Sequence, residues 1–162
     1  MAEEADGYRF RPATGEDDAF VYALHRAAMG DVVEATWGPW DEAVQRGFHE
    51  RSFSPERLQV VMVGGVETGV VDAGFEAPTV FYIGRIEILP RFQGVGLGSR
   101  ILRDLLAAAR GRGAAAAELH VLKANRARAL YERLGFAVIA DEDPKLRMRR
   151  ELSDADDAAA GR

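Results

Sequence analysis

The hydrophobic pattern of the first third of the chain predicts one short strand followed by a helix. Residues 8–12 alternate between apolar and polar side chains, as a half-buried strand does. Apolar side chains then recur at helical spacing (Phe20, Leu24, Ala27 and Ala28). Thr14, with Asp17 three residues later, is a typical helix start. We expect this first helix to end near Gly30.

A second helix is predicted from Asp41, which would cap it, to about Arg51. The segment between the two helices contains both tryptophans of the chain, Trp37 and Trp40, on either side of a Gly-Pro pair. We therefore expect the two tryptophans to lie in a loop or at a helix end.

From Leu58 onward the apolar period becomes that of strands. Two strands joined at Gly64-Gly65 form a predicted hairpin. Residues 79–89 form the next strand, and because its first half is apolar on both faces, it should be central in the sheet. An amphipathic helix follows, ending near Gly111, with one apolar face (Leu97, Ile101, Leu102, Leu105 and Leu106).

The last third of the chain predicts a strand, a short helix and a hairpin. The strand, residues 118–122, should run parallel to the preceding strand because a helix crosses over between them. The helix covers residues 125–134, and strands 136–140 and 146–150 form the hairpin. The predicted order is thus β-α-α-β-β-β-α-β-α-β-β.

Composition adds limits to this picture. A chain of 162 residues fits one domain, which we place at residues 8–151, with disordered tails at 1–7 and 152–162. No apolar run is long enough to span a membrane, and the acidic start is unlike a secretory or transit peptide, so we expect a cytoplasmic protein without a membrane partner.

The charge and the cysteine count exclude further classes of function. A net charge of −5 argues against nucleic acid as a partner and favours cationic ones. The absence of cysteine removes disulfides, thiolate metal sites and acyl-cysteine chemistry. The three histidines do not have zinc-binding spacing, and we expect no metal.

The stretch most indicative of chemistry is an apolar strand that leads into alternate glycines and then directly into a helix. Glycine permits positive φ and close approach of a ligand, and the first turn of a helix has N–H groups without intrahelical partners. With the positive end of the helix dipole, they form a cradle for a phosphate or pyrophosphate. The residues of this predicted cradle are Gln93, Gly94, Val95, Gly96, Leu97, Gly98 and Ser99.

Two common phosphate loops do not fit this stretch. A Walker A loop needs a lysine where the helix opens, but the chain reads Gly98, Ser99, Arg100. A dinucleotide-binding fingerprint counted from Gly94 needs its third glycine at position 99, which is serine.

The stretch instead resembles the acetyl-CoA loop of the GNAT acetyltransferase superfamily, Q/R-x-x-G-x-G/A, as Gln93, Gly96 and Gly98. A second block from Asn125, NRARALYERLGF, is similar to the other signature of that superfamily, in both spacing and order. The resemblance implies an α/β fold with a mixed, mostly antiparallel sheet of about seven strands, one splayed parallel pair and four helices.

The resemblance also implies a cofactor and its contacts. Acetyl-CoA would be the co-substrate, with its pyrophosphate at residues 93–99. Its pantetheine amides would pair with unpaired backbone groups near Ile86 and Ile88. Asn125 matches a position that braces the cofactor or a loop, although its place before a helix is also that of a plain N-cap.

Transfer to an amine needs a base, because an alkylammonium with a pKa near 10.4 is less than about a thousandth deprotonated at neutral pH. Glu87 is the candidate base; the alternative is an ordinary surface pair with Arg85. Tyr131 would donate a proton to the leaving sulfur, and its alternative is packing under its helix. Glu34, Asp31 and Asp41 are substitute bases on the loop that usually covers the acceptor in the superfamily.

The acceptor segment contains Glu34, Trp37 and Trp40, which could form an aromatic and anionic wall for an alkylammonium. The alternative is that the tryptophans pin a loop to the core. The acceptor would be a small-molecule or peptide amine, and a homodimer is possible. Three functions stay open: an N-acetyltransferase, a non-catalytic acyl-CoA-binding module, and a plain nucleotide binder.

Overall fold

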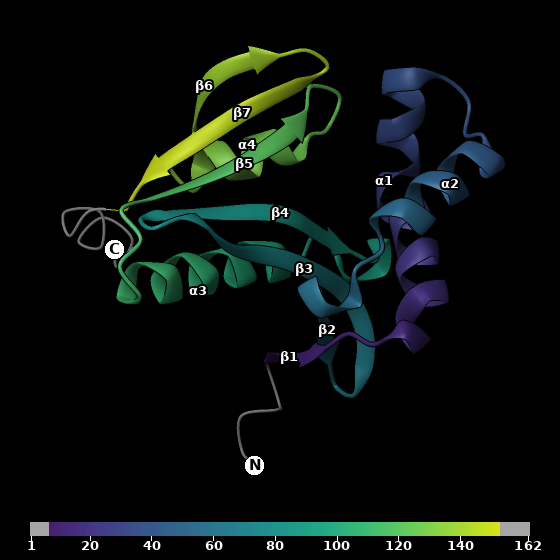
Figure 1. Ribbon diagram of the computed structural model, residues 1–162, viewed down its shortest axis with the longest axis horizontal. Coiled ribbons are helices and arrows are strands. Elements are labelled where there is room, and N and C mark those ends of the chain that lie inside the picture. The colour runs from purple at the N-terminus through teal and green to yellow at the C-terminus, as the bar shows by residue number, and fades with distance from the viewer. Residues whose placement is uncertain (1–6, 153–162) are drawn as a thin grey trace. The chain divides into compact units, whose positions relative to one another are not determined.

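The structure is a computed structural model that describes residues 7–152 (Figure 1). Of the predicted disordered tails, residues 1–6 and 153–162 lie outside the described part. Leu152 does not fit that prediction, because it is 8% exposed and its N–H donates to the Ala115 carbonyl. Within the described residues, no helix has the length and apolarity needed to cross a membrane.

The elements follow the predicted order. They are β1 (Tyr8–Pro12), α1 (Asp18–Trp37), α2 (Glu42–Ser52), β2 (Gln59–Val63), β3 (Val66–Ala77), β4 (Val80–Ile88), α3 (Leu97–Gly111), β5 (Ala116–Leu122), α4 (Ala127–Arg133), β6 (Ala137–Glu142) and β7 (Lys145–Glu151). Seven strands form one sheet in the order β1-β2-β3-β4-β5-β7-β6, mostly antiparallel, with β4 and β5 as its parallel pair. The predicted fold class is confirmed.

The described residues divide into two compact units, one of residues 7–72 and 85–95, the other of residues 73–84 and 96–152. In the first unit, α1 and α2 lie beside each other (Figure 1). The buried core of this unit is formed by α1, β2, β3 and two residues that flank strands, Ala13 after β1 and Leu58 before β2. Its other members are Val21, Leu24, Val60, Met62 and Val70. Of the four helix positions predicted from apolar spacing, only Leu24 belongs to this buried core; Phe20 and Ala28 are partly buried against it, and Ala27 is exposed. Val21, which that spacing did not include, is fully buried.

The prediction that the first helix ends near Gly30 is wrong. Helix α1 continues to Trp37, and Val33 on the continuation is buried. The helix ends where Gly38 takes a positive φ of 95°, followed by Pro39, which cannot continue a helix. One glycine inside a helix costs only about 1 kcal/mol, and burial of the next turn outweighs it.

The predicted helix starts are confirmed. The Thr14 side chain accepts from the Glu16 N–H while the Asp17 carboxylate accepts from the Thr14 N–H, as a capping box requires. This box opens a short 3₁₀ turn that continues into α1. Asp41 caps α2 by accepting from the Val44 N–H.

An irregularity in β3 shapes the end of β4. The register between β2 and β3 shifts between Val61 and Met62, so that Thr68 is an extra residue on β3. Thr68 is fully buried; its hydroxyl donates to the Val61 carbonyl, and its own carbonyl accepts from the Leu89 N–H at 2.8 Å. At the adjacent Gly69, a Cβ would lie 2.3 Å from the Glu87 carbonyl oxygen. Glycine at this position is therefore required by close backbone approach.

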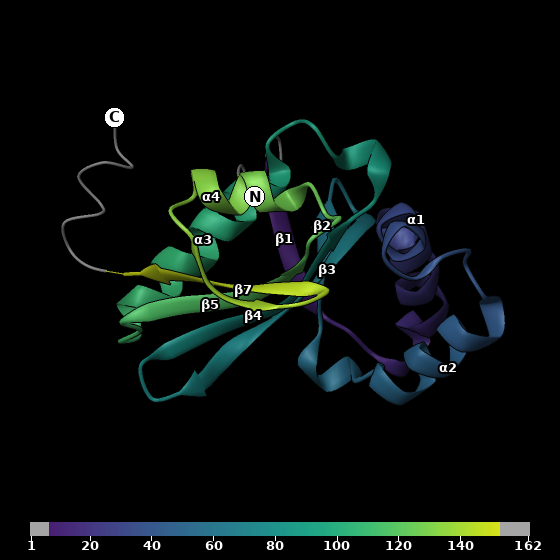
Figure 2. The ribbon, with the colours of Figure 1, turned by 90° about the horizontal axis from the view of Figure 1, so that it is seen from above.

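In the second unit, α3 and α4 lie on the same face of β5 and β7 (Figure 2). Helix α3 buries one stripe, formed by Ile101, Leu102, Leu106 and Ala109. The parallel pairing of β4 with β5 runs from Val80–Ala116 to Ile83–Leu119. Strand β5, in contrast, is paired with β7 along its whole length. The parallel pairing therefore involves only the first part of β4, from Val80 to Ile83.

We predict that Gly69→Ala destabilises the protein by about 3 kcal/mol, because the added methyl group meets a backbone oxygen that cannot rotate away. Gly30→Ala is the matched control: a Cβ there meets nothing within 4 Å, and the helical position should gain about 0.5–1 kcal/mol. Urea unfolding followed by circular dichroism measures both. Equal effects of the two substitutions would contradict the close approach.

Candidate active site

The glycine loop has the backbone that an anion cradle needs. A 3₁₀ turn over Pro90–Phe92 ends β4, and Gly94 and Gly96 then adopt positive φ values of 78° and 85°. A Cβ on either glycine would meet nothing within 4 Å, so backbone conformation, not crowding, calls for glycine at both positions. Val95 between them is 79% exposed.

Helix α3 begins directly after this loop and has no side-chain cap. Gly96, in the left-handed conformation, is its N-cap residue, and no side chain accepts a hydrogen bond there. The first N–H groups of an uncapped helix, together with its dipole, favour a negatively charged ligand. The uncapped backbone N–H donors at this helix start are therefore suited to the negatively charged phosphates of acetyl-CoA.

Gln93 has a local role that the sequence did not predict. Its side-chain amide donates to the Ile88 carbonyl at 2.8 Å and so ties the loop to the end of β4. We expected the backbone near Ile86 and Ile88 to be unpaired, and for the Ile88 carbonyl this is wrong. The end of the β4–β5 pairing at Ile83 is in keeping with the expected splay.

Two predicted residues come from the second unit. Tyr131 on α4 is 7% exposed, and its ring contacts Phe136 edge to face at 6.2 Å between centroids. Asn125 accepts from the Ala127 N–H at 2.9 Å, just before α4 begins. Packing against Phe136 accounts for the burial of Tyr131. The hydrogen bond at the start of α4 accounts for the side-chain conformation of Asn125. The roles of both residues toward a cofactor stay predictions.

Glu87 lies in the first unit and is not part of a surface pair. The residue is 7% exposed, and its carboxylate accepts from Arg85 Nε. A second partner comes from α1, where His25 Nδ1 lies 3.0 Å from Glu87 Oε2. Glu87 is thus a buried carboxylate between a guanidinium and an imidazole.

The partners of Glu87 determine its ionisation. Burial alone would raise the pKa of Glu87, but the hydrogen bond to His25 and the positive charge of Arg85 outweigh burial and hold the pKa below its usual value. The carboxylate is therefore ionised at neutral pH. Because it is buried and doubly bonded, it is poorly placed to take a proton from a substrate directly.

The acceptor segment is anchored through Trp40. The Trp40 indole N–H donates to Glu42 at 2.9 Å, its backbone N–H donates to Glu34 at 3.3 Å, and the Arg26 guanidinium lies 5.4 Å from the ring centroid. Trp37, the last residue of α1, is 61% exposed and is not packed into the core. The structure thus brings Glu34 and Trp40 together, while Trp37 faces solvent. A role of the three residues in binding an acceptor stays a prediction.

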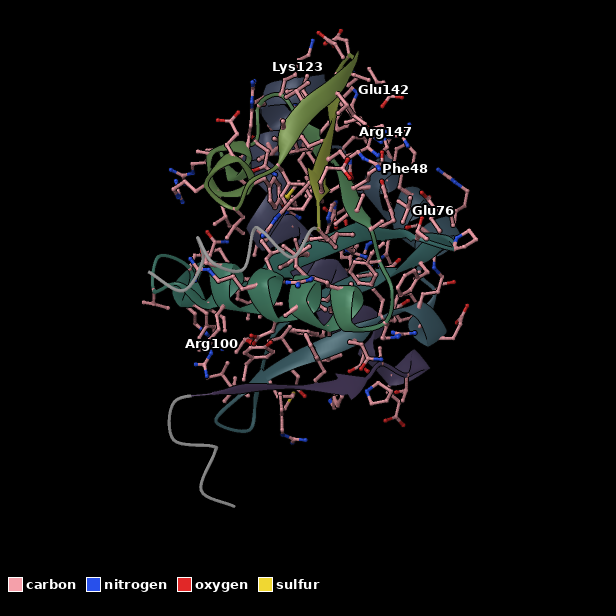
Figure 3. All side chains as sticks on the ribbon, turned by 90° about the vertical axis from the view of Figure 1, so that its left-hand side faces the viewer. Phe48, Glu76, Arg100, Lys123, Glu142 and Arg147 are labelled. Carbon is pink, nitrogen blue, oxygen red and sulfur yellow. The ribbon has the colours of Figure 1, made fainter. Side chains whose placement is uncertain are left out.

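Sequence reasoning missed two histidine clusters. The His25–Glu87 pair joins residues 62 positions apart, and no local pattern indicates it. In the second unit, the Tyr82 hydroxyl lies 2.6 Å from His120 Nδ1, and His120 Nε2 lies 2.8 Å from Glu142. Glu142 and the neighbouring Arg147 come from the two strands of the terminal hairpin (Figure 3). The second cluster forms because strand pairing brings residues of β4, β5 and β6 together. A single sequence does not specify the register of these strands.

The sequence profile described as the acetyltransferase (GNAT) family matches residues 19–136, which is more than half of the chain. The protein belongs to this family. No curated protein matches the sequence.

Solved structures share the fold. A PaiA N-acetyltransferase from Thermoplasma acidophilum, in complex with coenzyme A, is 15% identical, with a TM-score of 0.73 over 90% of this chain and 99% of that one. An acetyltransferase from Thermus thermophilus is 22% identical, with a TM-score of 0.68 over 90% and 97%. The ribosomal-protein-S18-alanine N-acetyltransferase of Escherichia coli is 21% identical, with a TM-score of 0.64 over 91% and 95%. At these identities the likeness shows the fold alone.

The lowered pKa of Glu87 predicts how stability depends on pH. Its folded-state pKa lies below the unfolded value of 4.5, so the unfolded chain binds the proton more tightly. The contribution of Glu87 is present above about pH 4.5 and is lost as pH falls through the folded pKa. In Glu87→Gln, the free energy of unfolding should therefore fall less between pH 6 and pH 3 than in the wild type. Denaturant titrations at several pH values measure this, and parallel curves would contradict it.

Proposed function

We propose that this protein transfers an acetyl group from acetyl-CoA to a primary amine, by direct attack of the amine on the thioester. Family membership supports acetyl transfer as the activity class. The observation that supports acetyl-CoA as the donor is the uncapped start of α3 behind two glycines with positive φ. The relative from Thermoplasma acidophilum is described in complex with coenzyme A, in keeping with this assignment.

In this proposal, the backbone of residues 93–99 holds the pyrophosphate through N–H groups, and the backbone near Ile86 receives an amide of the pantetheine arm. Gln93 keeps the loop in place through its bond to the Ile88 carbonyl. Asn125 orders the start of α4 and so the helix that contains Tyr131. Bound acetyl-CoA supplies an activated acyl group, and the chain supplies binding and proton transfer.

The chemistry requires two proton transfers, for which this chain has candidate groups. Tyr131 donates a proton to the sulfur as the carbon–sulfur bond breaks. The basic group on the amine side includes the carboxylate of Glu87. Because that carboxylate is buried and held by Arg85 and His25, it acts on the amine proton only through a neighbour or through water.

The acceptor in this proposal is a small-molecule or peptide amine. Among the relatives, one is named for the alanine of ribosomal protein S18 and another is an N-acetylglutamate synthase from Neisseria gonorrhoeae, so both kinds of acceptor occur within the fold. The acids and aromatic rings between α1 and α2 of this chain suit a cationic amine. A thiol-release assay with acetyl-CoA and a panel of n-hexylamine, phenethylamine, spermidine and an unblocked peptide tests the function.

A non-catalytic acyl-CoA-binding module is the second candidate, favoured by the packing of Tyr131 against Phe136, which explains that side chain without chemistry. Binding alone needs the glycine loop but not the phenolic hydroxyl. The two candidates therefore differ in what substitution of Tyr131 does.

Acetyl-CoA at about a hundred times its Kd should stabilise the fold by roughly 2.7 kcal/mol and raise Tm by roughly 5–10 °C. Gly96→Asp should abolish this shift, because it places a negative side chain at the start of α3. Gly65→Asp is the control, since Gly65 also has a positive φ and open surroundings but lies in the β2–β3 turn. Thermal unfolding with acetyl-CoA, NAD or ATP provides the measurement. Equal shifts with all three ligands would refute the cofactor assignment.

Tyr131→Phe should lower kcat about ten- to a thousandfold while leaving the affinity for CoA nearly unchanged, because it removes the proposed proton donor and keeps the ring. Steady-state kinetics and calorimetric titration with CoA separate the two quantities. An unchanged kcat would assign Tyr131 to packing, and no turnover by the wild type with any amine would favour the binding module.

A further inference from the structure

We infer that His25 takes the proton from the acceptor amine and that Glu87 acts behind it as a positioning residue. The inference rests on the proposed function and names the base of that reaction. It starts from the contact between His25 Nδ1 and Glu87 Oε2 at 3.0 Å and from the different exposure of the two side chains. The side chain of His25 is 29% exposed and that of Glu87 only 6%, so the imidazole is the member of the pair that solvent reaches.

The contact fixes the imidazole tautomer. Glu87 is ionised and can only accept a hydrogen bond, so Nδ1 of His25 must carry the hydrogen. In the neutral ring the lone pair then belongs to Nε2, for which the described residues offer no hydrogen-bond partner. His25 thus presents an oriented acceptor on its exposed side, as a general base needs.

The surroundings of His25 suit a cationic amine. The His25 ring lies 6.0 Å from the ring of Trp40, which places it beside the predicted acceptor segment within the same unit. Arg85 of β4 is bonded to Glu87, and Trp40 contacts Arg26 and Glu34 of α1 and Glu42 of α2. Arg85 and Arg26 are each bonded to a carboxylate, Glu87 and Glu42 respectively. The guanidinium charges are therefore partly compensated, and an ammonium can approach.

His25, Tyr131 and solvent account for every proton that the reaction moves. An ammonium N–H bond breaks and its proton goes to Nε2, which leaves the nitrogen lone pair to form the bond to the acetyl carbon. The carbon–sulfur bond breaks, and the sulfur takes a proton from Tyr131. Solvent takes the second proton lost by the amine nitrogen and returns one to Tyr131, and the first proton passes from His25 to solvent. The ionised carboxylate of Glu87 stabilises the protonated imidazole in between.

If the His25–Glu87 pair were purely structural, it would tie α1 to β4 and take no part in proton transfer. A structural role and a role as base predict different responses of activity to pH. A base is needed only while the amine is protonated, so the requirement for His25 should diminish as pH approaches the amine pKa near 10.4. A structural defect should instead lower activity by a similar factor at every pH.

The test uses the full chain with acetyl-CoA and the amine of the panel that turns over fastest. In His25→Asn the side-chain amide keeps a donor at the Nδ1 position for Glu87 and removes Nε2. We expect kcat/KM at pH 7 to fall about 10²–10⁴-fold, the deficit to shrink below about tenfold at pH 10, and acetyl-CoA affinity to stay unchanged. His49→Gln is the matched control, since His49 is also paired with an acid, Asp18, but is only 8% exposed; its pH profile should equal that of the wild type.

Three further measurements separate the outcomes. Glu87→Gln should lower kcat/KM at pH 7 less than His25→Asn does, and the loss should again shrink at pH 10, because it weakens the orienting bond and keeps Nε2. Added imidazole should restore part of the activity of His25→Ala. Nitrogen-15 NMR of the three histidines should show the Nδ1–H tautomer for His25 in the wild type.

A pH-independent loss in His25→Asn, no loss at all, or an Nε2–H tautomer would overturn the inference while leaving acetyl transfer in place. Should His25→Asn fail to fold, the imidazole response of His25→Ala and the wild-type tautomer decide the question. No turnover by the wild type with any amine would overturn the proposed function, and the inference with it.

Discussion

The close approach of β3 to the end of β4 is the constraint on which the candidate site in the first unit depends. Gly69 lets the β3 backbone come next to the Glu87 carbonyl, and the extra residue Thr68 holds the Leu89 N–H. With this part of the backbone fixed, the Glu87 carboxylate points to α1 and the chain turns at Pro90 into the glycine loop. A packing requirement between two strands thus fixes the backbone that carries a buried charge.

Features encoded within a few residues could be predicted from the sequence. The capping residues Thr14 and Asp41, the Gly64-Gly65 hairpin and the glycine loop each have a local physical cause, and each is found where expected. The prediction that α1 ends at Gly30 was wrong because a local signal competed with the burial of Val33, which depends on tertiary packing. Local rules fail where a longer-range free energy is larger.

The candidate site was only partly predictable for the same reason. Glu87 was identified by its place on the strand, but its burial and its partner His25 depend on how α1 packs on β4. The ionised state of a buried carboxylate is a property of its neighbours, and these neighbours are known only once the chain has folded. Tyr82, His120 and Glu142 come together through strand register, which a single sequence does not specify.

The exposed Val95 between two glycines indicates how little sequence information the cradle requires. Its donors are backbone N–H groups, so selection acts on a few backbone conformations and leaves the side chains around them free to vary. Chains that share this fold can then differ at about four positions in five, as the solved structures at 15–22% identity do. The proposed acceptor side depends instead on individual side chains such as His25 and Trp40, and a shared fold does not specify those.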